Sequence, residues 1–220
     1  MSRTYAVGDI HGSLGKLRSL VARCERDADG RPLLFVFLGD YIDRGPDSRG
    51  VVEYLIELQA RMPGRVIALK GNHESLAMAA LDSSMSAVHW LMEGGVMTLR
   101  SYRVSRADEL PANHLAWLRS LRLSYDDGQR LFVHAGVNPE KSLAAQDDSD
   151  LLWIREPFLS DARDYGRLIV HGHTPTSTGM PDLRANRLNI DTGAVYGRGL
   201  TAAVFDSGRT NPIAFLQTNE

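Results

Sequence analysis

Asp9 and His11 stand two positions apart near the start of the chain, in the segment GDIHG (8–12), directly after a short apolar run. In an extended chain, residues two apart point to the same side of the backbone. A carboxylate oxygen and an imidazole nitrogen together suit a divalent ion such as Mn, Fe or Zn. This pair therefore predicts part of a metal site.

A denser group of charges follows the apolar run Leu33–Leu38, where the segment GDYIDRG (39–45) holds Asp40, Asp43 and Arg44. A carboxylate such as Asp40 can bridge two ions, and one such as Asp43 can orient a histidine. The guanidinium of Arg44 can hold phosphate oxygens through paired hydrogen bonds. Charged loops are often merely solvated, but this one directly follows a predicted buried strand and is flanked by two glycines. We therefore interpret it as part of a site.

A third group of polar residues lies in the segment GNHE (71–74). Here Asn72 offers an amide oxygen as a further hard ligand, and His73 is a candidate acid. His134 and His173 each follow another apolar run. A single histidine in such a place is usually structural. Five predicted strand ends that each present Asp, His or Asn instead predict a dinuclear metal centre.

The elements that carry these side chains are visible as short runs of Val, Ile, Leu and Phe, most of them bounded by Gly, a pattern typical of buried strands. The expected strands are Thr4–Val7, Leu33–Leu38, Val66–Leu69, Leu131–Val133, Leu168–Val170, Leu188–Ile190 and Leu200–Phe205. Between them, apolar residues recur at helical spacing from Leu14 to Val21 and from Val51 to Leu58. This alternation indicates an α/β protein, in which ligands bind at strand ends.

The alternation of strand and helix breaks between residues 75 and 125. Helical patterns occur there at Leu76–Leu81 and Leu115–Leu121, separated by the segment HWLMEGG (89–95). We expect a helical insertion at 75–125 that covers one side of the site, with its Met and Trp side chains packed in a core. Because we find no repeat, low-complexity tract or linker, we expect residues 1–220 to form a single catalytic domain.

The overall composition excludes several classes of function. Twenty-five Lys and Arg residues against 27 Asp and Glu give a net charge of −2, which argues against a nucleic acid or membrane partner. Cys24 is the only cysteine, which excludes intramolecular disulfides and Cys-cluster metal sites, and its charged surroundings argue against thiolate catalysis. No apolar run suits a secretory signal or a membrane span, so we expect a cytoplasmic protein.

In this order and spacing, the motifs resemble those of the PPP family of metallophosphatases, in its small bacterial and phage form. Asp9 and Asp40 are 31 residues apart, and Asp40 and Asn72 are 32 apart. The similarity extends from Tyr5 to about Phe205. The later segments that agree are HAG (134–136), WIR (153–155), GHTP (172–175) and IDTGAVYG (190–197).

The resemblance implies a calcineurin-like metallophosphoesterase fold, a four-layer sandwich of two mixed β-sheets flanked by helices. It implies two divalent ions bridged by Asp40, with Mn²⁺ as the expected metal and Fe or Zn as alternatives. The implied metal ligands are Asp9, His11, Asp40, Asn72, His134 and His173. The implied catalytic residues are the acid His73, its carboxylate partner Asp43, and the phosphate-holding Arg44 and Arg155.

The resemblance further implies hydrolysis of phosphoserine and phosphothreonine in proteins by direct attack of a hydroxide that bridges the two metals. It leaves phosphotyrosine open as a further substrate. The expected partners are phosphoproteins or phosphopeptides, without nucleic acid or membrane, and a monomer suits this reading. His171 precedes the predicted ligand His173 by two positions. We expect His171 to be a buried strand residue, with a partial-ligand or outer-shell role as the alternatives.

Three other functions compete with this one. A symmetrical dinucleoside tetraphosphatase shares the scaffold, but such enzymes usually lack the Asp of the DRG motif and end the third motif with Asp, where this chain has Asp43 and Glu74. A nuclease or phosphodiesterase is disfavoured by the continuous DRG and GNHE motifs. A catalytically silent metal-binding scaffold predicts a missing ligand or acid, and none is missing.

Overall fold

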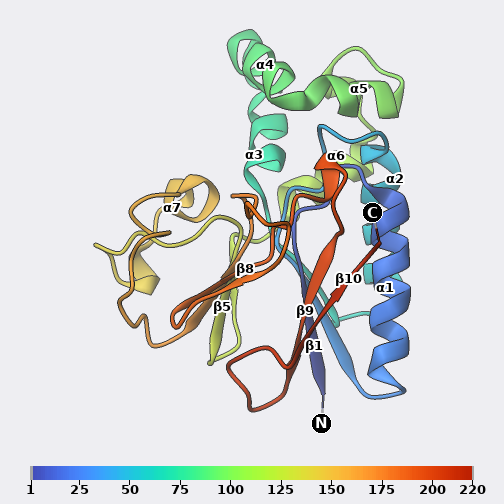
Figure 1. Ribbon diagram of the computed structural model, residues 1–220. Coiled ribbons are helices and arrows are strands. Elements are labelled where there is room, and N and C mark those ends of the chain that lie inside the picture. The colour runs from blue at the N-terminus through green and yellow to red at the C-terminus, as the bar shows by residue number, and fades with distance from the viewer. Residues whose placement is uncertain (1, 220) are drawn as a thin grey trace.

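The computed structural model describes residues 2–219, which form two five-stranded β-sheets packed face to face (Figure 1). The first sheet has the order β10-β9-β1-β2-β3. Its strands are β1 (Arg3–Val7), β2 (Leu33–Phe37), β3 (Val66–Ala68), β9 (Thr201–Asp206) and β10 (Ala214–Gln217). The second sheet has the order β4-β5-β6-β8-β7. Its strands are β4 (Ser124–Asp126), β5 (Arg130–Val133), β6 (Leu168–His171), β7 (Asp182–Leu183) and β8 (Arg187–Asn189).

Each sheet contains three parallel strands and is completed by antiparallel ones. β1, β2 and β3 run parallel, with Val7 opposite Phe37 and Phe37 opposite Ala68. β9 and β10 are antiparallel to their neighbours. In the second sheet β5, β6 and β8 run parallel, while β4 and β7 form antiparallel edges. Both sheets are therefore mixed, as expected, and five of the six parallel strands lead into predicted site residues.

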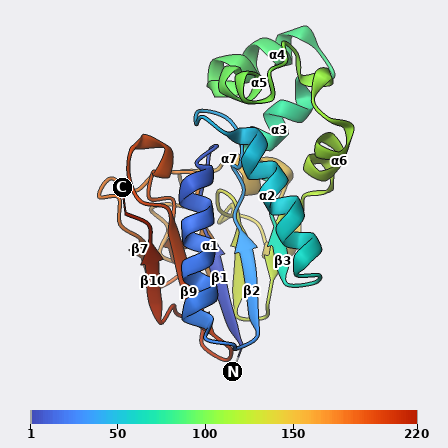
Figure 2. The ribbon, with the colours of Figure 1, turned by 90° about the vertical axis from the view of Figure 1, so that its right-hand side faces the viewer.

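The alternation of side chains along the strands builds three hydrophobic layers. Ala6 and Val36 point between the sheets and pack with residues of the second sheet. In the same layer, Phe132 of the second sheet meets Phe205 of the first sheet edge to face at 6.2 Å. On the outer face of the first sheet, Phe35 and neighbouring residues pack under helices α1 (Leu14–Ala28) and α2 (Ser48–Arg61) (Figure 2). This arrangement confirms the predicted helices in both segments.

The outer face of the second sheet is covered more thinly. Val133 and Ile169 pack there against Leu151 and Phe158, from helix α7 (Asp148–Trp153) and the irregular chain that follows it. A short 3₁₀ turn, η3 (Leu143–Ala145), precedes α7. The four-layer arrangement of two mixed sheets flanked by helices is confirmed, with loop making up much of the fourth layer.

The helical insertion projects from one end of the sheets (Figures 1 and 2). Its elements are α3 (Asn72–Ala79), α4 (Ser84–Trp90), the π-helical turn η1 (Leu91–Gly95), α5 (Val96–Tyr102), the 3₁₀ turn η2 (Ala107–Glu109) and α6 (Ala112–Ser120). The predicted bounds need two corrections. The first helix begins at Asn72, within the third motif. At the other end, Arg122 forms a single bridge with Leu69, which follows β3 of the first sheet, and the chain then enters β4 of the second sheet.

All seven expected strands are present, within a residue or two of the predicted bounds. The strands β4, β7 and β10 were not predicted, because they are short edge strands without a fully buried apolar run. Another 3₁₀ turn, η4 (Ala194–Tyr196), follows the last of the six parallel strands. Among residues 2–219, none of the helices has the length and apolarity that crossing a bilayer requires.

Candidate active site

Most predicted site residues lie in tight loops at the carboxyl ends of the parallel strands, while Asn72 and His73 begin helix α3 and Arg155 follows helix α7. Five residues of these loops that are not glycine have a positive φ: His11 (44°), Asp40 (52°), Asp43 (69°), Arg44 (66°) and His173 (65°). Such backbone is uncommon for residues with a Cβ and collects at functional sites. The turn has no room for a larger residue at Gly45, since a Cβ there would overlap the carbonyl oxygen of His11. The loops thus fix the directions of the site side chains.

Asp40 stands at the centre of the site, between histidines of both sheets. Its Oδ2 lies 3.3 Å from His11 Nε2, and its Oδ1 lies 3.4 Å from His134 Nε2. Two sets of potential ligand atoms, each within 4.8 Å of one another, share this carboxylate. The two sets are His11, Asp40 and His73, and Asp40, His134 and His173. A carboxylate common to two such sets has the geometry expected of a bridging ligand.

The hydrogen bonds of His134 direct a lone pair into the site. Its Nδ1 lies 2.9 Å from the carbonyl oxygen of Leu38 and donates to it, so the neutral ring carries a lone pair on Nε2. That nitrogen lies 2.8 Å from Asn72 Oδ1, which can only accept. Two acceptors facing each other at this distance repel unless a cation lies between them. A metal ion held by both atoms satisfies this requirement.

His11 follows the same pattern. Its Nδ1 donates to the carbonyl oxygen of Ile42 at 2.8 Å, which leaves the Nε2 lone pair facing Asp40 and the Arg44 guanidinium, whose Nη1 is 3.1 Å away. Metal-binding histidines usually donate their other N–H to a carbonyl or carboxylate in this way. The donor sets on both sides of Asp40 therefore fit divalent ions.

The ionisation of the buried groups also favours cations. Burial raises the pKa of Asp9 well above its usual value, and the carboxylates of Asp191 and Asp40 raise it further. Burial likewise raises the pKa of Asp191 to about 6. Burial opposes the charge of Asp40, but His134, His73 and His11 hold its pKa well below the usual value. Carboxylates buried this close together are costly unless positive charge compensates them.

The imidazoles of the second sheet are held in the neutral form that binds metals. Burial, together with the neighbouring His134, lowers the pKa of His173 to about 3, and burial lowers the pKa of His134. His173 Nδ1 lies 3.0 Å from Asn72 Oδ1, so it joins the same cluster. Its backbone N–H donates to Asp9 Oδ2 at 3.1 Å. Metal ligation requires such deprotonated nitrogen.

His73 differs from the other histidines because a side-chain carboxylate holds its Nδ1. Asp43 Oδ2 accepts the Nδ1–H bond at 2.8 Å, and both side chains are buried. His73 Nε2 has no hydrogen-bond partner among the described residues, although it is buried beside Asp40. Burial alone would lower the pKa of His73, but Asp40 and Asp43 raise it above its usual value. The ring is thus arranged to present a proton on Nε2.

Glu74 ties the second and third motif loops together. Its Oε2 accepts from the backbone N–H groups of Gly71 at 2.8 Å and Asp40 at 2.9 Å. Its Oε1 accepts from Tyr41 at 2.8 Å and Ile42 at 3.3 Å. Four backbone donors on one buried carboxylate hold the loop that presents Asp40 against the helix that presents Asn72.

A groove of about 560 Å³ opens beside the metal ligands, between the π-helical turn η1 and helix α7. His173 lines its inner end, and the exposed Arg155 lies beside it. The remaining charged residues of the groove are acidic, namely Glu93, Asp150 and Glu156. Glu93 lies 3.9 Å from Arg44, so both predicted phosphate-holding arginines border the same opening.

The structure brings the predicted acid His73 together with the predicted ligands, namely Asp9, His11, Asp40, Asn72, His134 and His173. His171 takes no part in either ligand set. It is buried, with its ring 5.0 Å from that of Phe158, as expected of a strand residue.

One buried carboxylate beside Asp9 was not predicted as a site residue. Asp191 follows β8 just as Asp9 follows β1, so the rule that identified the other strand ends could have found it.

Comparisons with known proteins agree with this geometry. A family model of the calcineurin-like phosphoesterases matches residues 2–197. Serine/threonine-protein phosphatase 1 of Salmonella typhimurium is 34% identical over 208 residues, which cover 90% of each chain. The asymmetrical bis(5'-nucleosyl)-tetraphosphatase PrpE of Anoxybacillus flavithermus is 28% identical over 221 residues, covering 89% of this chain and 87% of the relative.

Among solved structures, a crystal structure provisionally identified as a diadenosine tetraphosphatase is similar, with a TM-score of 0.71 at 21% identity. The similarity covers 98% of this chain and 92% of the other. At this identity the likeness concerns the fold. The relatives therefore carry two different named activities on one scaffold.

Proposed function

The chain belongs to the calcineurin-like phosphoesterase family and is a metallophosphoesterase, and we propose that it acts as a serine/threonine protein phosphatase. The observation that carries the proposal is the buried His73–Asp43 pair, with its free Nε2 beside the metal ligands. A phosphoserine leaves as an alkoxide, whose conjugate acid has a pKa far above 7, so its departure needs a proton. A dinucleoside tetraphosphate leaves as a nucleotide phosphate and needs no such acid.

The charge of the groove supports the same choice. Beyond Arg155, the groove presents the carboxylates of Glu93 and Glu156, while that of Asp150 is paired with Lys141. A dinucleoside tetraphosphate carries several negative charges along its phosphate chain and would meet these carboxylates. A peptide brings one phosphate and flanks of either charge. The groove therefore favours a phosphopeptide, and a basic flank most of all.

The residues divide the work of hydrolysis. Two divalent ions held by Asp9, His11, Asp40, Asn72, His134 and His173 would activate water near neutral pH and offset charge on the phosphoryl group. Arg44 and Arg155 orient the phosphoryl oxygens and stabilise the charge that develops on them. His73 donates its Nε2 proton to the leaving oxygen, while Asp43 holds the Nδ1–H. We expect Mn²⁺ as the ion, with Fe or Zn also suited to these nitrogen and oxygen ligands.

Hydrolysis in the presence of Mn²⁺ tests the substrate class, with phosphate release measured for the peptides and nucleotide products measured for the dinucleotide. A phosphoserine peptide, a phosphotyrosine peptide and diadenosine tetraphosphate are compared in parallel by kcat/KM. The proposal predicts the highest value for the phosphoserine peptide, with a further gain when basic residues flank the phosphoserine. A clear preference for the dinucleotide would instead assign the chain to the tetraphosphatases, and the nucleotide products would show whether cleavage is symmetrical.

A further inference from the structure

The Asp43 side chain receives hydrogen bonds from the helical insertion as well as from His73. The indole Nε1 of Trp90 in α4 donates to Asp43 Oδ2 at 2.9 Å, and the hydroxyl of Thr98 in α5 donates to Asp43 Oδ1 at 2.6 Å. Thr98 Oγ1 also accepts the backbone N–H of Asp43 at 2.9 Å. All of these groups are buried. Both carboxylate oxygens are therefore held by donors 47 and 55 residues further along the chain.

These two donors control how the carboxylate faces the histidine. The last torsion of an Asp side chain is soft and does not settle in one narrow rotamer. Hydrogen bonds to both oxygens remove that freedom, so the plane of the Asp43 carboxylate is fixed. The His73 ring follows it through its 2.8 Å Nδ1 contact, and this sets the direction of Nε2.

The Trp90 indole packs against the π-helical turn η1 of the insertion, where Gly95 leaves room for it. A Cβ on Gly95 would lie 2.6 Å from atoms Cδ2 and Cε2 of the indole, so glycine allows the ring to lie against the π-helical turn η1. The neighbouring Gly94 has a φ of 113°, and its carbonyl oxygen accepts the backbone N–H of Arg44 at 3.3 Å. Single π-helical turns of this kind are frequent at functional sites.

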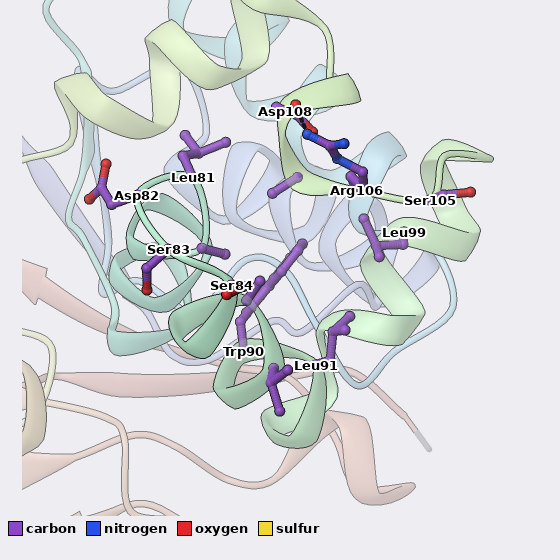
Figure 3. A pocket seen from close by; sticks show the side chains of 14 residues that line it. Leu81, Asp82, Ser83, Ser84, Trp90, Leu91, Leu99, Ser105, Arg106 and Asp108 are labelled. Atoms are coloured by element: carbon purple, nitrogen blue, oxygen red, sulfur yellow. Dashed lines mark hydrogen bonds and ion pairs between the residues drawn. The ribbon is translucent and has the colours of Figure 1, made fainter.

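Figure 3 shows the other side of the indole, where Trp90, the last residue of α4, lines a hollow of about 470 Å³ together with Leu91 and Leu99. Packing in a core explains the apolar part of the indole. Packing does not explain why the N–H of the Trp90 indole points at the carboxylate that holds His73.

We propose that Trp90 and Thr98 are positioning residues for the Asp43–His73 pair, so that the insertion takes part in proton donation to the leaving group. This inference rests on the proposed role of His73 as the acid. A purely structural role for the two residues predicts equal effects on all substrates. A positioning role predicts effects that depend on how much protonation the leaving group needs.

The test compares a phosphoserine peptide with an activated aryl phosphate, whose leaving group needs little protonation. Thr98→Val removes the hydroxyl with little change in volume and leaves Ser48 Oγ as acceptor for the Asp43 backbone N–H, whereas Trp90→Phe removes the indole donor together with part of the ring. We expect each to lower kcat on the phosphoserine peptide about tenfold, the typical weight of one hydrogen bond to a charged group, with KM unchanged. The loss on the aryl phosphate should be several times smaller. Thr98→Ser keeps the hydroxyl and should restore kcat.

A matched control is available in α6. Trp117 also donates its indole N–H, to Gln59 Oε1 at 2.6 Å, but does not contact Asp43. Trp117→Phe should leave the ratio of the two kcat values unchanged. Gly95→Ala retains both donors but displaces the indole, and it should reproduce the selective loss. It also serves as a second variant should Trp90→Phe fail to fold.

His73→Asn in the same assay distinguishes the acid role of His73 from the positioning role of Trp90 and Thr98. If His73→Asn affects both substrates equally, the acid role itself is wrong. If His73→Asn is selective but the Trp90, Thr98 and Gly95 variants reduce both substrates equally, or reduce neither, the positioning role is wrong and the acid role stands.

Discussion

The Nδ1 atom of His73 lies 2.8 Å from Oδ2 of Asp43, and solvent reaches neither side chain. In this contact the Nδ1–H of His73 donates to the carboxylate, and Nε2 therefore faces the cluster around Asp40. The other histidines of the site instead donate to backbone carbonyls, as His11 does to Ile42 and His134 to Leu38, or join the ligand cluster directly. The nature of the Nδ1 partner thus separates the candidate acid from the candidate ligands.

Replacing this acid should matter only where the leaving group needs a proton. His73→Asn should lower kcat on a phosphoserine peptide by about 10²–10⁴-fold, the usual contribution of general acid catalysis. The loss should be much smaller on an aryl phosphate with a good leaving group. Metal content, measured by elemental analysis, should be unchanged. An equal loss on both substrates would exclude the acid role.

The Glu74 carboxylate should contribute to the free energy of unfolding of the protein. Glu74→Gln replaces one carboxylate oxygen by an NH₂ group, which then faces two backbone N–H groups that have lost their acceptor. We expect a loss of about 2–4 kcal/mol in the free energy of unfolding, because these donors are buried. Urea unfolding of the metal-free protein measures it.

The control for that measurement is Glu53→Gln, which breaks an exposed pair between Arg49 and Glu53 on α2 and should change stability little. A Glu74→Gln protein as stable as this control would show that the four hydrogen bonds do not hold the loops together.

His171 should make the metal-free protein sensitive to acid. Burial, with a smaller effect of the Arg187 charge, lowers the pKa of His171 to about 3, whereas in an unfolded chain it is about 6.5. Below pH 6.5 the unfolded state therefore binds a proton that the folded state does not, and stability falls as the pH falls toward 3. The loss is at most about 1.4 kcal/mol per pH unit.

His171→Phe removes this proton and keeps an aromatic ring beside Phe158. Urea unfolding at pH 7 and pH 5 should show that the wild type loses about 2 kcal/mol relative to the variant between these two values. Every other titrating group is common to both proteins. If their free energies of unfolding changed in parallel with pH, His171 would take up a proton in the folded protein as readily as in the unfolded chain, and the prediction would be wrong.

Cys24 should be chemically silent in the folded protein. The side chain is buried in the face of α1 that packs on the first sheet, and burial, aided by Asp27, raises the pKa of the thiol to about 12. Iodoacetamide at pH 8 should leave native protein unlabelled by mass and fully active, and should label it completely in guanidinium. Inactivation of the native enzyme by the reagent would reopen the thiolate route that the sequence argued against.

The parallel strands and their polar ends were predictable because a buried strand between two layers is a continuous apolar run. β2 is the clearest case: it reads LLFVF and leads directly into Gly39 and Asp40. β10 was missed because half of its residues are exposed and its partner β9 lies on one side only. Edge strands depend on pairing that a local pattern does not encode.

The predicted ligands were found by one rule, which looks for Asp, His or Asn after a strand. Asp191 obeys that rule too, since it follows the predicted strand Leu188–Ile190, but it was not included among the ligands. Trp90 and Thr98 obey no such rule. They lie in helices whose apolar pattern predicts core packing, and their contact with Asp43 exists only once the insertion has folded back over the loop. No local signal could have identified them.

Metal stoichiometry tests the central claim most directly. The protein is stripped with a chelator, titrated with Mn²⁺ and assayed at each step for bound metal and for phosphate release from a phosphoserine peptide. The ligands on the two sides of Asp40, which are Asp9 and His11 on one side and Asn72, His134 and His173 on the other, predict two ions per chain, no activity in the stripped protein, and recovery that follows occupancy. A stripped protein that hydrolyses the peptide at the full rate, or one that saturates with a single ion, would contradict the two-metal account.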